Sequence, residues 1–142
     1  LPRSMTSSAL EPVDHEKASE LSGLLQRCYG VSSWYKAPEF GVEGWELLSR
    51  ASAFLLPLPE SPLSGTGGSR VVVVTSAHIV HPFKFPKYYP ESEHPWLHLL
   101  TPDHVRTKFE VRDSRGALLS ALPLRKQVWA HPTLDVALAL PK

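Results

Sequence analysis

Short apolar runs separated by turn-forming residues dominate the chain from residue 50 onward. The residues at 107–112 alternate between polar and apolar, whereas those at 71–74 are all valine, which is too apolar for a strand with one face in water. Strands are predicted at 52–58, 70–75, 107–112, 117–124, 127–130 and 136–140. Short strands at regular spacing, with turns between them, are typical of a mainly β fold, either a barrel or a sandwich.

The N-terminal residues repeat with the period of a helix instead. Asp14 is a suitable N-cap, apolar side chains recur at helical spacing through Cys28, and Gly30 is placed to end a helix. We therefore predict a short amphipathic α-helix at 15–29, with Cys28 as a buried thiol.

Residues 31–44 contain Pro, Gly and Ser and are predicted to form a connection that aromatic side chains hold against a surface. On this basis the chain divides into an N-terminal extension, residues 1–45, and a β domain, residues 46–142. Two long connections interrupt the β domain: 59–69, rich in Pro, Ser and Gly, and 81–105, which holds five prolines among aromatic and histidine residues. Proline at this density rules out an ordinary helix or a central strand, so a long insertion loop is predicted there.

Composition narrows the class of protein. The 142 residues carry 15 basic and 14 acidic side chains, a net charge of +1, which gives no general attraction to nucleic acid or to an anionic membrane. The single cysteine cannot form an internal disulfide, so we expect an intracellular or organellar protein, with the mitochondrion or plastid as candidates, and not a disulfide-rich secreted one.

No apolar run is long enough to cross a bilayer. The first residue is Leu1 and not methionine, which indicates an upstream segment, such as a targeting peptide, that was removed, left out or replaced.

Two residues stand where catalytic side chains are expected in a β-barrel. His78 follows the predicted strand at 70–75, and Asp135 precedes the one at 136–140. A histidine acts as a general base when one ring nitrogen takes up a proton while a carboxylate holds the other nitrogen, fixing the tautomer and stabilising the charged ring. We therefore predict that His78 and Asp135 face each other at one rim of the barrel.

The motifs around both residues resemble those of trypsin-like serine proteases. Thr-Ser-Ala-His-Ile-Val at 75–80 is similar to the Thr-Ala-Ala-His segment of that family, and Asp-Val-Ala-Leu at 135–138 is similar to its Asp-Ile-Ala-Leu segment. Ile79 stands where secreted trypsins carry a bridging cysteine, and His131-Pro132 ahead of the aspartate follows the pattern of the HtrA/Deg type.

This resemblance, which covers residues 50–142, implies the first β-barrel of a chymotrypsin-like double-barrel fold. It implies peptide-bond hydrolysis with His78 as the general base and Asp135 as its orienting carboxylate. The two residues are 57 positions apart, more than is usual in the family, so the segment 81–105 is expected to loop out near the active-site mouth.

The nucleophile is the missing part of this set of motifs. In the chain order His, Asp, Ser, no serine follows Asp135, so the nucleophile and the second barrel are absent and this chain alone is expected to be inactive. One interpretation is a serine endopeptidase that acts on polypeptide substrates. The other is a catalytically inactive, protease-like subunit of a larger assembly, whose open barrel face binds protein partners.

No cofactor or metal is implied. A metal site can be drawn from five histidines, but no cysteine or paired carboxylate completes the ligand set. These histidines are His78, His81, His94, His98 and His104. The glycine-rich run at 65–68 lacks the Lys-Ser/Thr of a phosphate loop, so a hairpin connection is the better interpretation.

Overall fold

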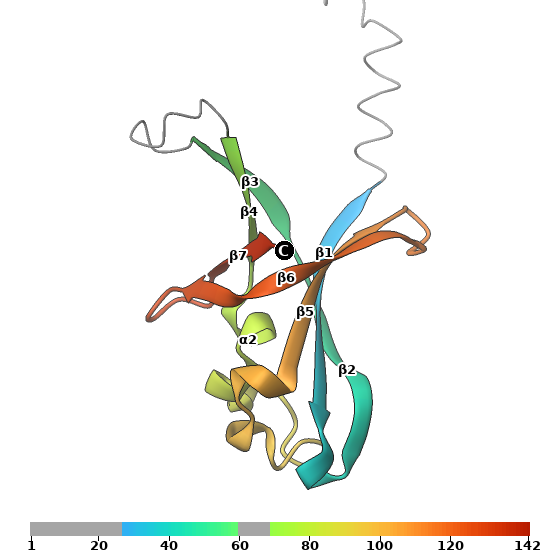
Figure 1. Cartoon of the computed structure of the whole chain (residues 1–142), viewed down its shortest axis with the longest axis vertical. Helices are drawn as coiled ribbons and strands as arrows, with labels where there is room; N and C mark the ends of the chain where they lie inside the picture. Colours follow the sequence, from blue (N-terminus) through green and yellow to red (C-terminus); the bar gives the residue numbers. More distant parts are fainter. Residues whose placement is uncertain (1–26, 60–68) are drawn as a thin grey trace, which may run out of the picture.

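Seven antiparallel strands form one sheet in the computed structural model, which describes residues 27–59 and 69–142 (Figure 1). The strands are β1 (Cys28–Ala37), β2 (Val42–Ser52), β3 (Phe54–Pro59), β4 (Ser69–Thr75), β5 (Val105–Arg112), β6 (Leu118–Ala130) and β7 (Ala137–Pro141). Their order in the sheet is β2-β1-β5-β6-β7-β4-β3. The prediction of a mainly β fold is confirmed. Most of the predicted helix at 15–29 and of the predicted loop at 59–69 lies outside the described residues.

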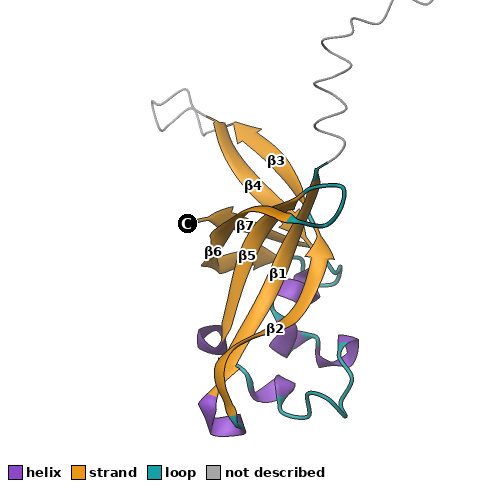
Figure 2. Cartoon of the chain, turned by 90° about the vertical axis from the view of Figure 1, so that its right-hand side faces the viewer, coloured by secondary structure: helices purple, strands orange, loops and turns teal. Residues whose placement is uncertain are grey.

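The two edge strands of the sheet are consecutive in the sequence, because only Ala53 separates β2 from β3. No ladder pairs these two strands in the described part of the chain, so the sheet is not closed. The Ala53 N–H donates to the Tyr29 carbonyl oxygen at 3.0 Å, and Thr75 Oγ1 donates to the Ser52 carbonyl oxygen at 3.0 Å. The junction of the two edges is therefore tied to β1 and to β4, and the sheet is strongly bent (Figures 1 and 2).

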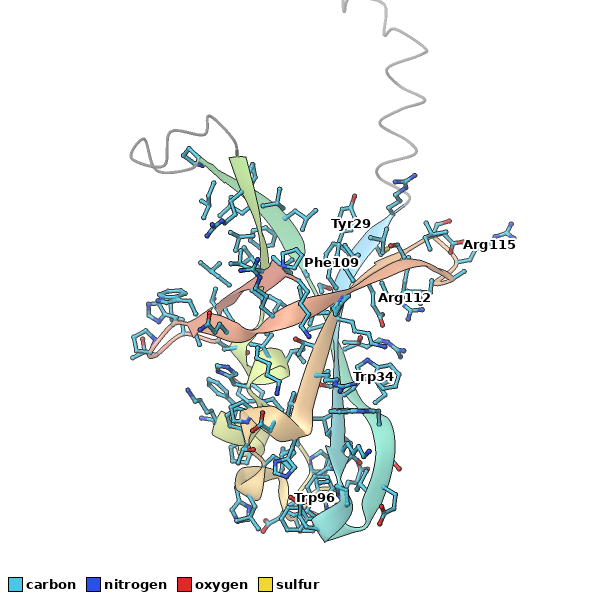
Figure 3. The ribbon with its side chains drawn as sticks, in the orientation of Figure 1. Tyr29, Trp34, Trp96, Phe109, Arg112 and Arg115 are labelled. Atoms are coloured by element: carbon cyan, nitrogen blue, oxygen red, sulfur yellow. The ribbon has the colours of Figure 1, made fainter. Side chains whose placement is uncertain are left out.

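The main core cluster joins the sheet to the turn that follows β4. Its buried members are Val31, Val73, Ala77, Ile79, Val80, Phe109, Leu124, Ala137 and Ala139. Ile79 is only 1% exposed, and Tyr29 stacks on Phe109 with ring centroids 5.7 Å apart (Figure 3). Burial of an aliphatic side chain of this size contributes about 1.5–3 kcal/mol, so Ile79 fixes where the chain goes after β4.

The segment 81–105 is a succession of single helical turns at one end of the sheet (Figure 2). The short helices of this segment are η3 (Pro82–Lys84), η4 (Pro86–Tyr88), η5 (Leu97–Leu99) and η6 (Pro102–His104). Two others in the described chain, η1 (Pro38–Phe40) and α2 (Ala77–Val80), come before it. Proline lies in the first turn of η3, η4 and η6, where its missing N–H is not needed. Leu97 and Tyr35 are buried in a second core cluster, which Trp96 borders while stacking on Phe40. The predicted insertion is therefore a packed segment of short helical turns, and its last residue, Val105, begins β5. Among the residues that the structure describes, none of the helices has the length and apolar character needed to span a bilayer.

The predictions for the N-terminal part were wrong where the structure describes it. Cys28 begins β1 and is exposed, and the connection predicted at 31–44 contains most of β1 and the start of β2. A domain boundary at residue 45 therefore falls inside β2. A Cβ at Gly30 would lie 2.9 Å from the Ala51 carbonyl oxygen, so this glycine allows two strands to approach closely and does not end a helix.

β6 also differs from the prediction. The segments 117–124 and 127–130 were predicted as two strands, but they form one strand that pairs first with β5 and then with β7. Its register shifts between Leu124 and Val128, where it changes from one neighbour to the other. Such an irregularity bends a strand, and here it turns the two halves of the sheet relative to each other.

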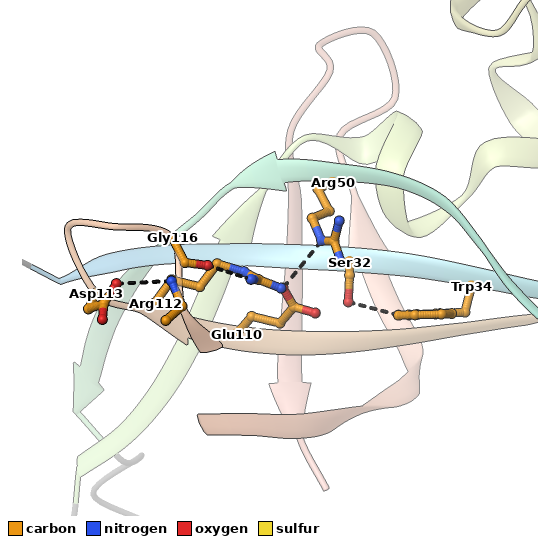
Figure 4. A network of polar contacts seen from close by, with 8 residues as sticks. Ser32, Trp34, Arg50, Glu110, Arg112, Asp113 and Gly116 are labelled. Atoms are coloured by element: carbon orange, nitrogen blue, oxygen red, sulfur yellow. Dashed lines mark hydrogen bonds and ion pairs between the residues drawn. The ribbon is translucent and has the colours of Figure 1, made fainter. Parts of the chain in front are cut away.

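A buried carboxylate links three strands. Glu110 in β5 has a side chain only 6% exposed (Figure 4). Arg112 donates to Glu110 Oε2 from Nε at 3.1 Å and from Nη2 at 2.9 Å, and Arg50 Nε lies 3.5 Å from the same oxygen. Burial alone would raise the pKa of Glu110, but hydrogen bonds from Ser32 and Arg112 and the charges of both arginines outweigh it and lower the pKa. The ionised carboxylate therefore connects β5 with β1 and β2.

Glu110→Gln is expected to lower the free energy of unfolding by about 1–3 kcal/mol at pH 7, because a neutral amide leaves Arg112 without its charged partner. Urea denaturation measures this difference. Glu43→Gln, at an exposed position in β2, is the matched control and is expected to remain close to wild type. Equal stability of the two variants would contradict a stabilising role for the buried carboxylate.

Candidate active site

The sheet brings the C-terminal end of β4 and the N-terminal end of β7 to one place. These strands are antiparallel neighbours, with Thr75 opposite Ala137. After Thr75 the chain enters the single turn α2, in which His78 is the second residue, and Asp135 lies two residues before β7. The sequence predicted His78 at a strand end, whereas the structure places it in this helical turn, three residues beyond β4.

His78 and Asp135 are joined by two hydrogen bonds. The His78 backbone N–H donates to Asp135 Oδ1 at 2.8 Å, and the ring Nδ1 lies 2.6 Å from Oδ2. Both side chains are partly buried, at 22% and 28% exposed. Because one residue holds both carboxylate oxygens, the orientation of the carboxylate relative to the imidazole ring is fixed. The structure thus brings together the two residues that the motifs single out.

The charge of Asp135 determines which nitrogen of the His78 ring carries a proton. Burial alone would raise the pKa of Asp135, but the hydrogen bonds from the backbone and ring of His78, the electrostatic attraction of that ring and the Ala77 N–H outweigh it and lower the pKa. An ionised carboxylate only accepts hydrogen bonds, so Nδ1 of His78 carries a proton. In the neutral ring the lone pair is then on Nε2, the nitrogen that does not contact Asp135. No hydrogen bond reaches Nε2 from a residue that the structure describes.

Two tyrosines from the segment 81–105 also contact His78. The Tyr88 ring lies parallel to the imidazole, with centroids 4.4 Å apart and an interplanar angle of 9°. The Tyr89 hydroxyl donates to the His78 carbonyl oxygen at 2.7 Å. Sequence reasoning missed both residues, although the long separation between the histidine and the aspartate placed this segment near the site.

His131 holds the turn that leads to Asp135. Its Nδ1 accepts hydrogen bonds from the N–H groups of Thr133 at 3.1 Å and Leu134 at 2.9 Å. Its own N–H donates to the Val136 carbonyl oxygen at 2.9 Å. A side-chain acceptor that binds backbone N–H groups two and three residues ahead is the device that Asp and Asn supply in many turns. The sequence predicted the turn but not this role of the imidazole.

Two other histidines of the described chain contact residues other than Asp135. His104 Nε2 pairs with Glu39, and His94 packs edge-to-face against Tyr89 and Trp96. No group of three or more His, Cys, Asp and Glu side chains in residues 27–59 and 69–142 is arranged to hold a metal ion.

No protein-family model, curated protein or solved structure matches this chain. Its function is therefore inferred from the motifs and from the geometry around His78 and Asp135.

Asp135→Asn is expected to lower the free energy of unfolding by about 1.5–3 kcal/mol at pH 7, since an amide offers one acceptor oxygen where the carboxylate offers two to the backbone N–H and the Nδ1–H of His78. The folded chain lowers the pKa of Asp135, so its stabilisation is complete above the unfolded pKa of about 3.9 and is lost as the pH falls through the folded value. The difference between wild type and Asp135→Asn is therefore expected to shrink below about pH 4 when urea denaturation is repeated across the pH range.

Asp103→Asn is the control for removal of an aspartate charge, because Asp103 is an exposed partner of Lys126. This variant is expected to stay near wild type at pH 7, as exposed ion pairs contribute little. A deficit of Asp135→Asn that stays constant into acid would contradict an ionised Asp135 in the pair.

Proposed function

We propose that this chain is the His–Asp half of a serine peptidase, the N-terminal barrel of a trypsin-like fold of the HtrA/Deg type. The observation that carries the proposal is the double hydrogen bond between His78 and Asp135. It joins a candidate general base to a candidate orienting carboxylate within the motifs at 75–80 and 135–138, in the chain order of that family.

In this mechanism Nε2 of His78 accepts the proton of a serine hydroxyl as the serine oxygen attacks a peptide carbonyl carbon. Asp135 stabilises the imidazolium that forms and keeps Nδ1–H directed at its carboxylate. Nε2–H then returns the proton to the leaving amine nitrogen, while backbone N–H groups stabilise the oxyanion. The proposed mechanism assigns the serine and the oxyanion donors to polypeptide outside these 142 residues.

The strand order supports a barrel of this family. When β2 and β3 are counted as one strand bent at Ala53, every strand has two neighbours and the order becomes a ring: β2/β3, β1, β5, β6, β7, β4. A ring of strands removes the free edges that an open sheet presents. The hydrogen bonds from Ala53 to Tyr29 and from Thr75 to Ser52 tie the bend to both neighbours, which favours this interpretation.

A second candidate function is a protease-like subunit that binds protein partners and does not hydrolyse peptides. The apolar surface of the β3–β4 hairpin favours it, because five large apolar side chains there are 38–57% exposed. They are Phe54, Leu55, Leu56, Leu58 and Val71. Apolar side chains grouped in this way are typical of a surface that contacts another protein. In this second candidate, a polypeptide partner with a complementary apolar face covers the hairpin.

Labelling with a fluorophosphonate, which reacts with activated serines, separates the two candidates. The protein encoded by the complete reading frame that contains these 142 residues is expected to be labelled at a serine in a Gly-x-Ser-Gly segment downstream of Lys142. His78→Ala is expected to slow labelling at least about 100-fold, because a general base contributes about 10²–10⁴ to such a reaction. Mass spectrometry identifies the labelled residue.

His98→Ala is the matched control, since His98 is exposed in the same segment of the chain and is expected to leave the labelling rate unchanged. The 142-residue chain alone is expected not to react. Two results would refute the peptidase and favour the subunit that binds partners. One is that the folded complete protein is not labelled, and the other is that its His78→Ala variant is labelled at the wild-type rate.

A further inference from the structure

The Tyr89 hydroxyl connects the candidate base to a distant strand. It donates its one proton to the His78 carbonyl oxygen at 2.7 Å, because a carbonyl oxygen only accepts. Ser49 Oγ in β2 lies 3.1 Å from the same hydroxyl and is therefore the donor in that contact. Burial raises the pKa of Tyr89 by more than the Ser49 hydrogen bond lowers it, so the hydroxyl keeps its proton at neutral pH. Tyr89 thus ties the backbone at His78 to β2.

Tyr88 acts on the ring of the same histidine. Its phenol lies against the imidazole face at a centroid distance of 4.4 Å, nearly parallel to it. Phe85 supports Tyr88 edge-to-face at 6.1 Å and itself packs against the main core cluster. Tyr88 remains 50% exposed, so its ring is held by its contacts with His78 and Phe85 more than by burial.

The backbone around these tyrosines is restrained. Pro86 begins η4, and its ring fixes its φ angle. The Tyr88 N–H donates to the Phe85 carbonyl oxygen and the Tyr89 N–H to the Pro86 carbonyl oxygen, both at 3.1 Å. Neighbouring residues of one short turn can therefore present a ring to the imidazole face and a hydroxyl to the backbone of the same histidine.

We propose that Tyr88 and Tyr89 are positioning residues for His78. Asp135 holds the Nδ1 edge, Tyr88 holds one face of the ring and Tyr89 holds the backbone, so that Nε2 points in one direction. Tyr88 acts through its ring and Tyr89 through its hydroxyl. The positioning is a property of this chain itself, whereas its value for catalysis rests on the proposed function.

Proton NMR of the 142-residue chain tests this division of roles. The Nδ1 proton of His78, held by Asp135, is expected as a slowly exchanging downfield signal in the wild type. Tyr89→Phe and Tyr88→Ala are each expected to accelerate its exchange with water about 5- to 10-fold, the effect of losing one local contact. Tyr88→Phe keeps the ring and is expected to leave the exchange rate unchanged.

Tyr35→Phe is the matched control for loss of a hydroxyl, because it removes the hydrogen bond from Tyr35 to Glu46 and does not touch His78. Its His78 signal is expected to match the wild type. The proposal is overturned if the signal is missing in the wild type, if Tyr89→Phe and Tyr88→Ala leave the exchange unchanged, or if Tyr35→Phe accelerates it equally. Failure of fluorophosphonate labelling would refute the peptidase and leave this positioning role intact.

Discussion

The carboxylate of Asp135 accepts hydrogen bonds from both the backbone and the ring of His78, and the rest of the site is arranged around this double contact. The contact depends on two turns at neighbouring strand ends. After β4 the chain makes one helical turn, fixed by the buried Ile79, and this turn presents the histidine. Before β7 the chain makes a turn that His131 holds through two backbone N–H groups, and this turn presents the aspartate. The pairing of β4 with β7 sets the two turns side by side.

This arrangement determines which nitrogen of the His78 ring carries a proton. An ionised carboxylate on one side of an imidazole places the proton on the near nitrogen and leaves the far nitrogen able to accept one. Two tyrosines from a proline-rich segment add contacts on the face of the ring and on the backbone of the same residue. Asp135, Tyr88 and Tyr89 thus restrain the edge, the face and the backbone of one histidine. The contacts therefore leave Nε2 of His78 as the ring nitrogen that can accept a proton, which is the feature on which the proposed peptidase function depends.

Strands with a strong apolar pattern could be predicted from the sequence. Segments whose residues are equally common in two kinds of structure could not. The four valines predicted β4, and the short apolar run after the aspartate predicted β7. β1 was missed because Ser32 and Ser33 are both fully buried, which hides the alternation of a strand. It was missed also because a glycine that ends a helix and a glycine that relieves close contact between strands, as Gly30 does, look the same in a sequence. The histidine and aspartate could be named from their motifs. Tyr88 and Tyr89 could not, because a proline-rich segment has no period that shows which aromatic ring meets the site.

A double-mutant cycle between His78 and Asp135 tests the central claim most directly. The free energy of unfolding at pH 7 is measured by urea denaturation for the wild type, His78→Ala, Asp135→Asn and the double variant, and the non-additive part is the coupling between the ring and the carboxylate. The account predicts a favourable coupling of about 1–3 kcal/mol, the contribution of a hydrogen bond to a charged group. A coupling below about 0.3 kcal/mol, the range of independent sites, would contradict it.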